Sequence, residues 1–213
     1  MSKSWAGFRA WEVSELRRFQ RPGEPGSDSD IPEPRGSRTG MGEILSRSLF
    51  PEMTRTVTIK VSNRTQDITL DYPRIYLHGG RCSVPSDPEV PPGCSTTCEF
   101  SSSSSPGCSG VLSFWAKTCT LVIFFSNPLE DDKSPRELGL ELSPHRKVCR
   151  LKDLYEEMSG RDPKLVTKDS NFERVALDIC QDSIWKTQGP LNVMATMLNA
   201  RNAVVSVAVR GFK

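Results

Sequence analysis

The chain has 213 residues, enough for one domain of ordinary size plus an extension. Apolar residues make up 36%, below the usual globular share, so part of the chain is expected to lie outside any core. The net charge of +2 gives no support to nucleic-acid binding, and no apolar run reaches the roughly 18 residues of a membrane-spanning helix.

The first forty residues are predicted to lie outside the folded core. Residues 1–20 place Glu12 and Glu15 on the same helical arc as their apolar residues, which leaves a weak amphipathic pattern. Residues 21–40 hold four prolines and four glycines among charges and serines, and such a composition buries too little surface to offset the entropy of ordering. We therefore expect residues 1–40 to form a disordered or weakly helical extension.

A short amphipathic helix is predicted over residues 41–52. Pro51 ends the helical pattern. Ten helical residues span about 15 Å, because each adds about 1.5 Å, and this is half of a hydrocarbon core of about 30 Å. The apolar face of this helix consists of Met41, Ile44, Leu45 and Leu49.

From residue 53 onward the hydrophobic period changes to two. Residues 56–62 alternate polar and apolar side chains, which is typical of a half-buried strand. Residues 83–110 are rich in proline, serine and glycine and are expected to be mostly loop. The apolar runs at 111–115 and 121–125 have the length and composition of central strands.

One helix and a final hairpin complete the pattern. Apolar residues at 151, 154, 155 and 158 follow helical spacing, and Gly160 ends that helix. Residues 193–197 and 205–209 alternate on either side of a turn, as in a β-hairpin. Many short strands with one firm helix predict a mainly β fold, an antiparallel β-sandwich flanked by one or two short α-helices, over residues 53–213.

Catalytic groups are sparse in this sequence. His78 and His145 are the only histidines, no nucleophile elbow is present, and no glycine-rich phosphate loop occurs. An activated nucleophile needs a positioned base, and no spacing in the chain supplies one. We therefore expect a protein that is not an enzyme and that uses no cofactor.

The cysteines allow more than one interpretation. Seven are present, and an odd number cannot pair completely within one chain. His78, Cys82, Cys94 and Cys98 have spacings permitted for zinc, but unrelated loop thiols or a disulfide pair explain them as well, and no metal is predicted. The sequon Asn63-Arg64-Thr65 follows the first strand, where an exposed position is expected, and it matters only in an exported chain.

A succession of motifs from Thr54 to Lys213 resembles the sea anemone cytolysins known as actinoporins. The strongest piece is the apolar strand Thr120–Pro128, which ends in Ser-x-Pro as the family's strand does. Each motif is short, and it is their order and spacing that carry the resemblance. The other motifs, in chain order, are Arg55–Asn63, Tyr76–Gly80, Val84–Gly93, Gly110–Phe114 and Leu154–Met158.

The resemblance implies a membrane-binding, pore-forming protein. By this resemblance, phosphocholine headgroups, especially sphingomyelin, would bind at Ser109, Ser126, Pro128 and Tyr155. The protein would then form a homo-oligomer, and its N-terminal amphipathic helix would insert to line a cation-conducting pore. The resemblance also implies action outside the cell on a target-cell membrane, whereas the lack of an apolar signal-peptide core leaves a cytoplasmic location open.

The differences between this sequence and the actinoporin motifs leave an alternative open. The family carries tryptophan and tyrosine after Ser-x-Pro, whereas residues 129–137 contain no aromatic residue and several acidic ones. Each lost aromatic removes roughly 0.5–2 kcal/mol of choline attraction. The alternative is therefore a non-lytic module that binds a lipid or a protein. For Tyr155 a separate alternative is that it faces the core at its helical position.

Overall fold

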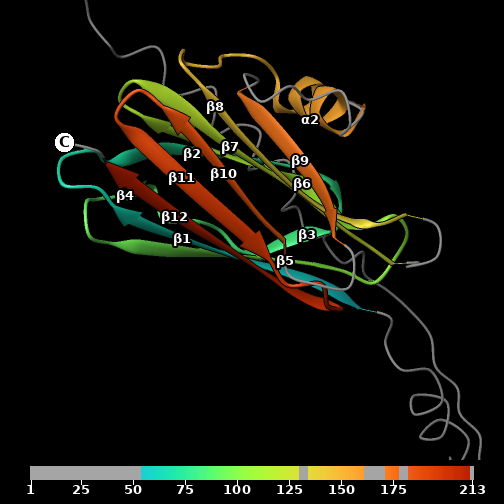
Figure 1. The fold of residues 1–213 in the computed structure, drawn as a ribbon. Helices are drawn as coiled ribbons and strands as arrows, with labels where there is room; N and C mark the ends of the chain where they lie inside the picture. The colour runs from blue at the N-terminus through green and yellow to red at the C-terminus, as the bar shows by residue number, and fades with distance from the viewer. Residues whose placement is uncertain (1–53, 130–133, 161–170, 178–181, 212–213) are drawn as a thin grey trace, which may run out of the picture. The chain divides into compact units, whose positions relative to one another are not determined.

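The computed structural model describes residues 54–129, 134–160, 171–177 and 182–211. These residues form strands in two six-stranded sheets that face each other, with one helix on the outside (Figure 1). The predicted mainly β sandwich is thereby confirmed. The extension at 1–40 and the predicted helix at 41–52, with Met41, Ile44, Leu45 and Leu49, lie outside the described residues.

Sheet A contains both the first and the last strand of the sandwich. Its central pair, β1 and β12, runs parallel, and all its other neighbouring strands are antiparallel. In spatial order its strands are β10 (Asp182–Gln188), β11 (Leu191–Met197), β12 (Asn202–Gly211), β1 (Arg55–Arg64), β5 (Ser95–Ser102) and β3 (Arg81–Val84).

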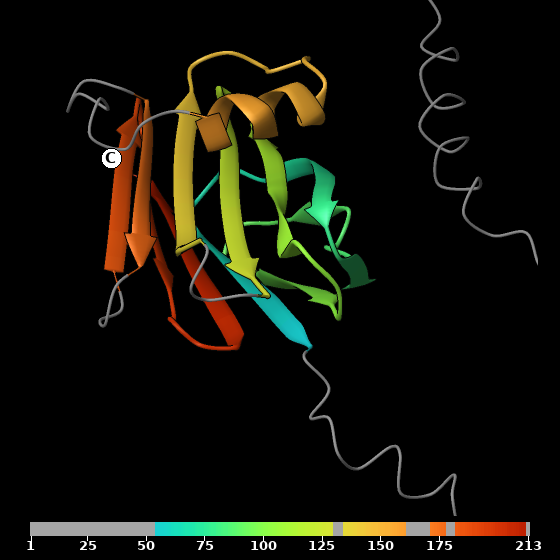
Figure 2. The same cartoon turned by 90° about the vertical axis from the view of Figure 1, so that its right-hand side faces the viewer.

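Sheet B is antiparallel throughout and forms the second layer. In spatial order its strands are β4 (Glu89–Val90), β2 (Leu70–Gly79), β6 (Gly107–Ala116), β7 (Cys119–Pro128), β8 (Arg136–Ser143) and β9 (Phe172–Leu177). The helix α2 (Leu151–Gly160) follows β8 and packs beside β2 and β6 (Figure 2).

The burial pattern separates the two sheets. Strand β1 alternates, with Val57, Ile59 and Val61 fully buried and the intervening side chains partly exposed, as the sequence predicted. Strand β7 is buried on both faces, because one face meets sheet A while the other lies under α2. Its uninterrupted apolar run follows from this double burial.

The loop prediction for residues 83–110 was wrong in part. The segment holds β4, β5 and the start of β6, and β5 pairs with both β1 and β3. The inward face of β5 mixes Cys98 and Phe100 with the buried polar residues Thr96 and Ser102. The alternation was therefore hidden in the sequence, because polarity no longer marked which side chains face the core.

The prediction that the sequon asparagine is exposed was wrong. Asn63 is 1% exposed, and its Nδ2 donates to the carbonyl oxygens of Ile68 at 2.7 Å and Val90 at 2.8 Å. Its Oδ1 accepts from the hydroxyl of Thr65 at 2.8 Å. The side chain thus satisfies buried backbone groups where β1 ends, which leaves no room for a glycan in the folded domain.

A second buried asparagine joins the two sheets. Asn127, on β7 in sheet B, donates from Nδ2 to the carbonyl oxygens of Thr56 at 3.0 Å and Arg201 at 2.9 Å, at one end of sheet A. Its Oδ1 accepts from Nε of Arg136 at 2.9 Å. Because Asn127 is fully buried, these bonds replace those that water would otherwise make.

Candidate functional site

The structure brings the four predicted headgroup residues to one part of the outer face of sheet B. Ser109 on β6 and Ser126 on β7 are direct cross-strand partners, and Pro128 pairs with Gly107 further along the same two strands. The phenol oxygen of Tyr155, on α2, donates to Oγ of Ser109 at 3.4 Å. That these residues bind a lipid remains a prediction.

The helix is held over this face by its apolar side. Leu154, Tyr155 and Met158 pack against Val111 and Phe124, on the outer face of β6 and β7. These contacts form a second hydrophobic cluster, separate from the core between the sheets. The spacing that predicted the helix therefore also aims Tyr155 at the serines.

Aromatic rings surround Tyr155. Its ring stacks on the imidazole of His78, with 4.9 Å between centroids and 16° between planes, and lies 5.7 Å from Tyr76 and 5.5 Å from Phe124. Tyr76 and His78 are two residues apart in β2 and so point to the same face. Tyr155 is 9% exposed whereas His78 is exposed, so the imidazole is the open surface of this cluster.

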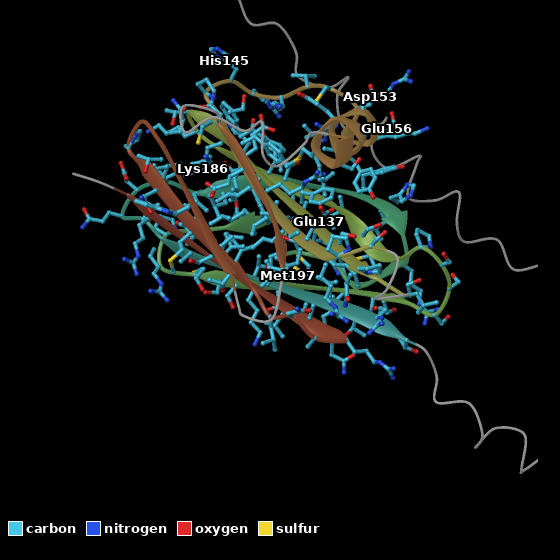
Figure 3. The ribbon with its side chains drawn as sticks, turned by 45° about the vertical axis from the view of Figure 1, so that its right-hand side comes forward. Glu137, His145, Asp153, Glu156, Lys186 and Met197 are labelled. Atoms are coloured by element: carbon cyan, nitrogen blue, oxygen red, sulfur yellow. The ribbon has the colours of Figure 1, made fainter. Side chains whose placement is uncertain are left out.

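An ion pair lies beside the serines. Glu137 on β8 is the cross-strand partner of Ser126, and its Oε1 lies 3.6 Å from Nε of Arg174 on β9. Figure 3 shows Glu137 in the strand layer beneath α2. Burial raises the pKa of the Glu137 carboxyl, and the charge of Arg174 opposes that rise. Burial also raises the pKa of Tyr155, whereas its hydrogen bond to Ser109 lowers it.

Arg174 also fixes the end of the helix. Its Nη1 donates to the carbonyl oxygen of Met158 at 2.8 Å and to that of Ser159, which lie in the last turn of α2. A cation at this position satisfies terminal carbonyls and complements the helix dipole. Its guanidinium carbon also lies 5.9 Å from the centroid of the Phe124 ring.

The sequence did not predict Tyr76, Phe124, Glu137 or Arg174 as parts of the site, and it considered His78 as a zinc ligand but not as a headgroup residue. In the structure His78 stacks on Tyr155, and the described residues contain no group of three His, Cys, Asp or Glu side chains that could hold a metal ion. The alternation of Tyr76 and His78 in β2 was the available signal. No signal in the sequence indicated the ion pair of Glu137 and Arg174, because it depends on which strands become neighbours.

The side chains at this site can form two kinds of contact with a ligand. Hydroxyl groups can donate to phosphate or carbonyl oxygens, and both Ser109 and Ser126 carry one. An aromatic face attracts a quaternary ammonium, and the exposed ring of His78 stacks on Tyr155, whose ring in turn lies beside Tyr76. The helix α2, the one helix among the described residues, is not long and apolar enough to span a bilayer.

Comparison with known proteins gives a likeness of fold. No protein-family model matches the chain, and no curated protein matches its sequence. The solved structure of the lipid binding protein Nakanori is similar with a TM-score of 0.54 and 10% identity, over 78% of this chain and 75% of that one. IP-1A from Alcaligenes faecalis gives a TM-score of 0.38 and 13% identity, over 75% and 92% of the two chains. The chain thus shares its fold with Nakanori, while the resemblance to actinoporins still rests on its sequence motifs.

Proposed function

We propose that the sandwich is a lipid-binding module that takes phospholipid headgroups on the outer face of sheet B, beside α2. The observation that carries this proposal is the meeting of Ser109, Ser126 and Tyr155, which come from three separate elements. A lipid-binding protein of the same fold supports the assignment, and the motif resemblance to actinoporins supports phosphocholine as the headgroup.

The chemistry of a phosphocholine headgroup fits the groups present. Its phosphate oxygens would accept a hydrogen bond from the half-exposed hydroxyl of Ser126, whereas Ser109 is 4% exposed and already bonds to Tyr155. Its trimethylammonium would lie against the exposed face of His78 and the accessible edge of Tyr76. Tyr155 would then act chiefly by positioning, because its ring is already enclosed by His78 and Phe124.

The fuller form of the proposal includes assembly on the membrane. In it the bound chains form a homo-oligomer at the outer face of a target-cell membrane, with no catalysis. The apolar face of residues 41–52 then inserts to line a cation-conducting pore. An amphipathic segment directly before the sandwich supports this step.

The binding step is tested with vesicles of phosphatidylcholine and sphingomyelin. Ser126→Asp puts a negative charge where the phosphate would lie, and we expect vesicle affinity to fall by about tenfold or more, since a hydrogen bond to a charged group is worth about 1.5–3 kcal/mol. Ser62→Asp is the matched control, because Ser62 lies on the outer face of sheet A. Equal co-sedimentation of Ser126→Asp and wild type would contradict the site.

The pore step has its own readout. We expect dye release from the same vesicles by the full chain and none by a chain lacking residues 1–52, with both still co-sedimenting. Co-sedimentation without release by the full chain would overturn the pore and leave a non-lytic lipid-binding module. Failure of both chains to bind would overturn lipid binding itself.

A further inference from the structure

The connection between β8 and α2 concentrates positive charge at one end of sheet B. We name residues 144–150 the basic loop. From Pro144 to Lys152 the sequence contains no acidic residue, and Figure 3 shows His145 at the outer edge of the domain. The basic side chains of this stretch are His145, Arg146, Lys147, Arg150 and Lys152.

The backbone of the basic loop is held in place from two strands. Arg74, on β2, donates to the carbonyl oxygens of Lys147 at 3.2 Å and Cys149 at 3.0 Å. Oγ1 of Thr120, on β7, donates to the carbonyl oxygen of His145 at 2.9 Å and accepts from the backbone nitrogen of Lys147 at 3.0 Å. A loop fixed in this way presents its side chains with little further loss of entropy on binding.

Apolar groups stand among these charges. Val148 is 79% exposed, at a point where Arg74 holds the backbone on both sides. Tyr72 is 57% exposed and has a φ of 51°, a region that a bulky residue rarely adopts. The guanidinium carbon of Arg146 lies 4.9 Å from the centroid of the Tyr72 ring. An exposed valine, an exposed tyrosine and nearby cations are together typical of a surface that contacts a membrane.

The cations of the basic loop differ in whether they form ion pairs. Lys147 is paired with Glu141 at 2.6 Å, but within the described part of the chain neither Arg146 nor Arg150 forms an ion pair. A negatively charged surface would therefore attract the basic loop.

We propose that the basic loop and Tyr72 bind the surface of anionic phospholipid bilayers. Val148 and Tyr72 enter the headgroup region, and Arg146 and Arg150 pair with lipid phosphates and carboxylates. This contact is separate from the headgroup site at Ser109 and Ser126, which lies toward the other end of β6 and β7. It rests on the proposed function only in taking a membrane as the partner.

The test uses the full chain with phosphatidylcholine vesicles, with and without phosphatidylserine, at low and high salt. Each basic residue near an anionic surface is worth about fivefold in affinity, so Arg146→Gln/Arg150→Gln should lower binding to the phosphatidylserine vesicles by about twenty-five-fold. Binding should also weaken with salt. The matched control is Lys60→Gln/Arg210→Gln, which removes two exposed charges from the outer face of sheet A and should bind as wild type.

A second variant separates a membrane from other polyanions. Val148→Ser keeps every charge, and we expect it to lower vesicle binding by about fivefold, since it removes apolar surface that the headgroup region would bury. Unchanged binding by Val148→Ser, with competition by a short RNA, would overturn the assignment to lipid. Equal binding of wild type and Arg146→Gln/Arg150→Gln to phosphatidylserine vesicles would overturn the surface itself.

The outcomes also distinguish this surface from the headgroup site. If the basic loop alone is right, Ser126→Asp binds phosphatidylserine vesicles as wild type does. If the headgroup site alone is right, binding does not respond to phosphatidylserine or to Arg146→Gln/Arg150→Gln, and sphingomyelin vesicles still bind the wild type better than Ser126→Asp.

Discussion

The ring of Tyr155 on α2 stacks on the imidazole of His78 on β2, with centroids 4.9 Å apart and planes 16° apart. The helix thereby meets sheet B through two ring faces in addition to its aliphatic contacts. The phenol oxygen of Tyr155 reaches Ser109 at 3.4 Å, a long distance for an O–H···O hydrogen bond. The ring therefore contributes more to the position of α2 than the hydroxyl does.

Substitution of Tyr155 should separate these two contributions. Tyr155→Ala removes a buried ring and is expected to lower the free energy of unfolding by about 3–4 kcal/mol, whereas Tyr155→Phe should lower it by less than about 1 kcal/mol. Urea unfolding followed by circular dichroism gives both values. Similar losses in the two variants would mean that the hydroxyl, and not the ring, holds the helix.

Removal of the buried amide at Asn127 should weaken the junction between the sheets. Asn127→Ala leaves the carbonyl oxygens of Thr56 and Arg201 and the Nε of Arg136 without this partner, and we expect a loss of about 2–4 kcal/mol. The neighbouring half-exposed Ser126 provides the control, since Ser126→Ala should change stability by less than about 0.5 kcal/mol. If both variants unfold at the same urea concentration, the junction does not depend on this amide.

The thiols should differ in reactivity according to burial. Burial raises the pKa of Cys98 and of Cys108 to about 12 and that of Cys119 to about 11, and the reactive species is the thiolate. Cys82, Cys94 and Cys149 are exposed, although partial burial raises the pKa of Cys82 as well. We expect iodoacetamide at pH 8 to label the three exposed thiols in the folded protein and the three buried ones only in urea, as read by peptide mass spectrometry. Equal labelling of Cys98 with and without urea would refute the buried position.

The same buried thiols predict a loss of stability in alkali. The unfolded chain releases these protons near pH 9, whereas the folded protein keeps them until about pH 11–12, so folded molecules bind more protons in this window. Stability therefore falls as pH rises above about 9, by up to about 1.4 kcal/mol per pH unit for each thiol. Urea midpoints under reducing conditions at pH 8, 9 and 10 measure the slope, and Cys98→Ala should make it shallower. An unchanged slope in this variant would contradict the assignment.

The sequence predicted those helices and strands in which the spacing of apolar residues matches the spacing of buried side chains in the structure. Strand β1 alternates cleanly, and α2 keeps its apolar positions on one side, so both were expected with nearly their observed bounds. Strand β5 was missed because Thr96 and Ser102 occupy inward positions that are usually apolar. The alternation of polar and apolar residues therefore predicts a strand only where the buried side chains are apolar, and it fails where hydroxyl side chains take buried positions.

The candidate site could be predicted only through the resemblance of motifs. Ser109, Ser126 and Tyr155 were expected at one site, and the structure brings them together. The pairing of Glu137 with Arg174 could not be foreseen, because it follows from β9 joining the edge of β8. The order of strands in a sheet depends on contacts between residues far apart in the chain, and these contacts cannot be predicted from the local pattern of a single sequence.

The parallel pairing of β1 with β12 has a consequence for synthesis on the ribosome. The earliest strand of the sandwich has the latest strand as a neighbour along nine register pairs, from Thr56–Asn202 to Arg64–Arg210. Until residues 202–211 leave the exit tunnel, β1 has an unpaired edge in the middle of its own sheet, and such edges favour aggregation. The edge of β1 therefore stays open to pairing with other chains until β12 has left the tunnel.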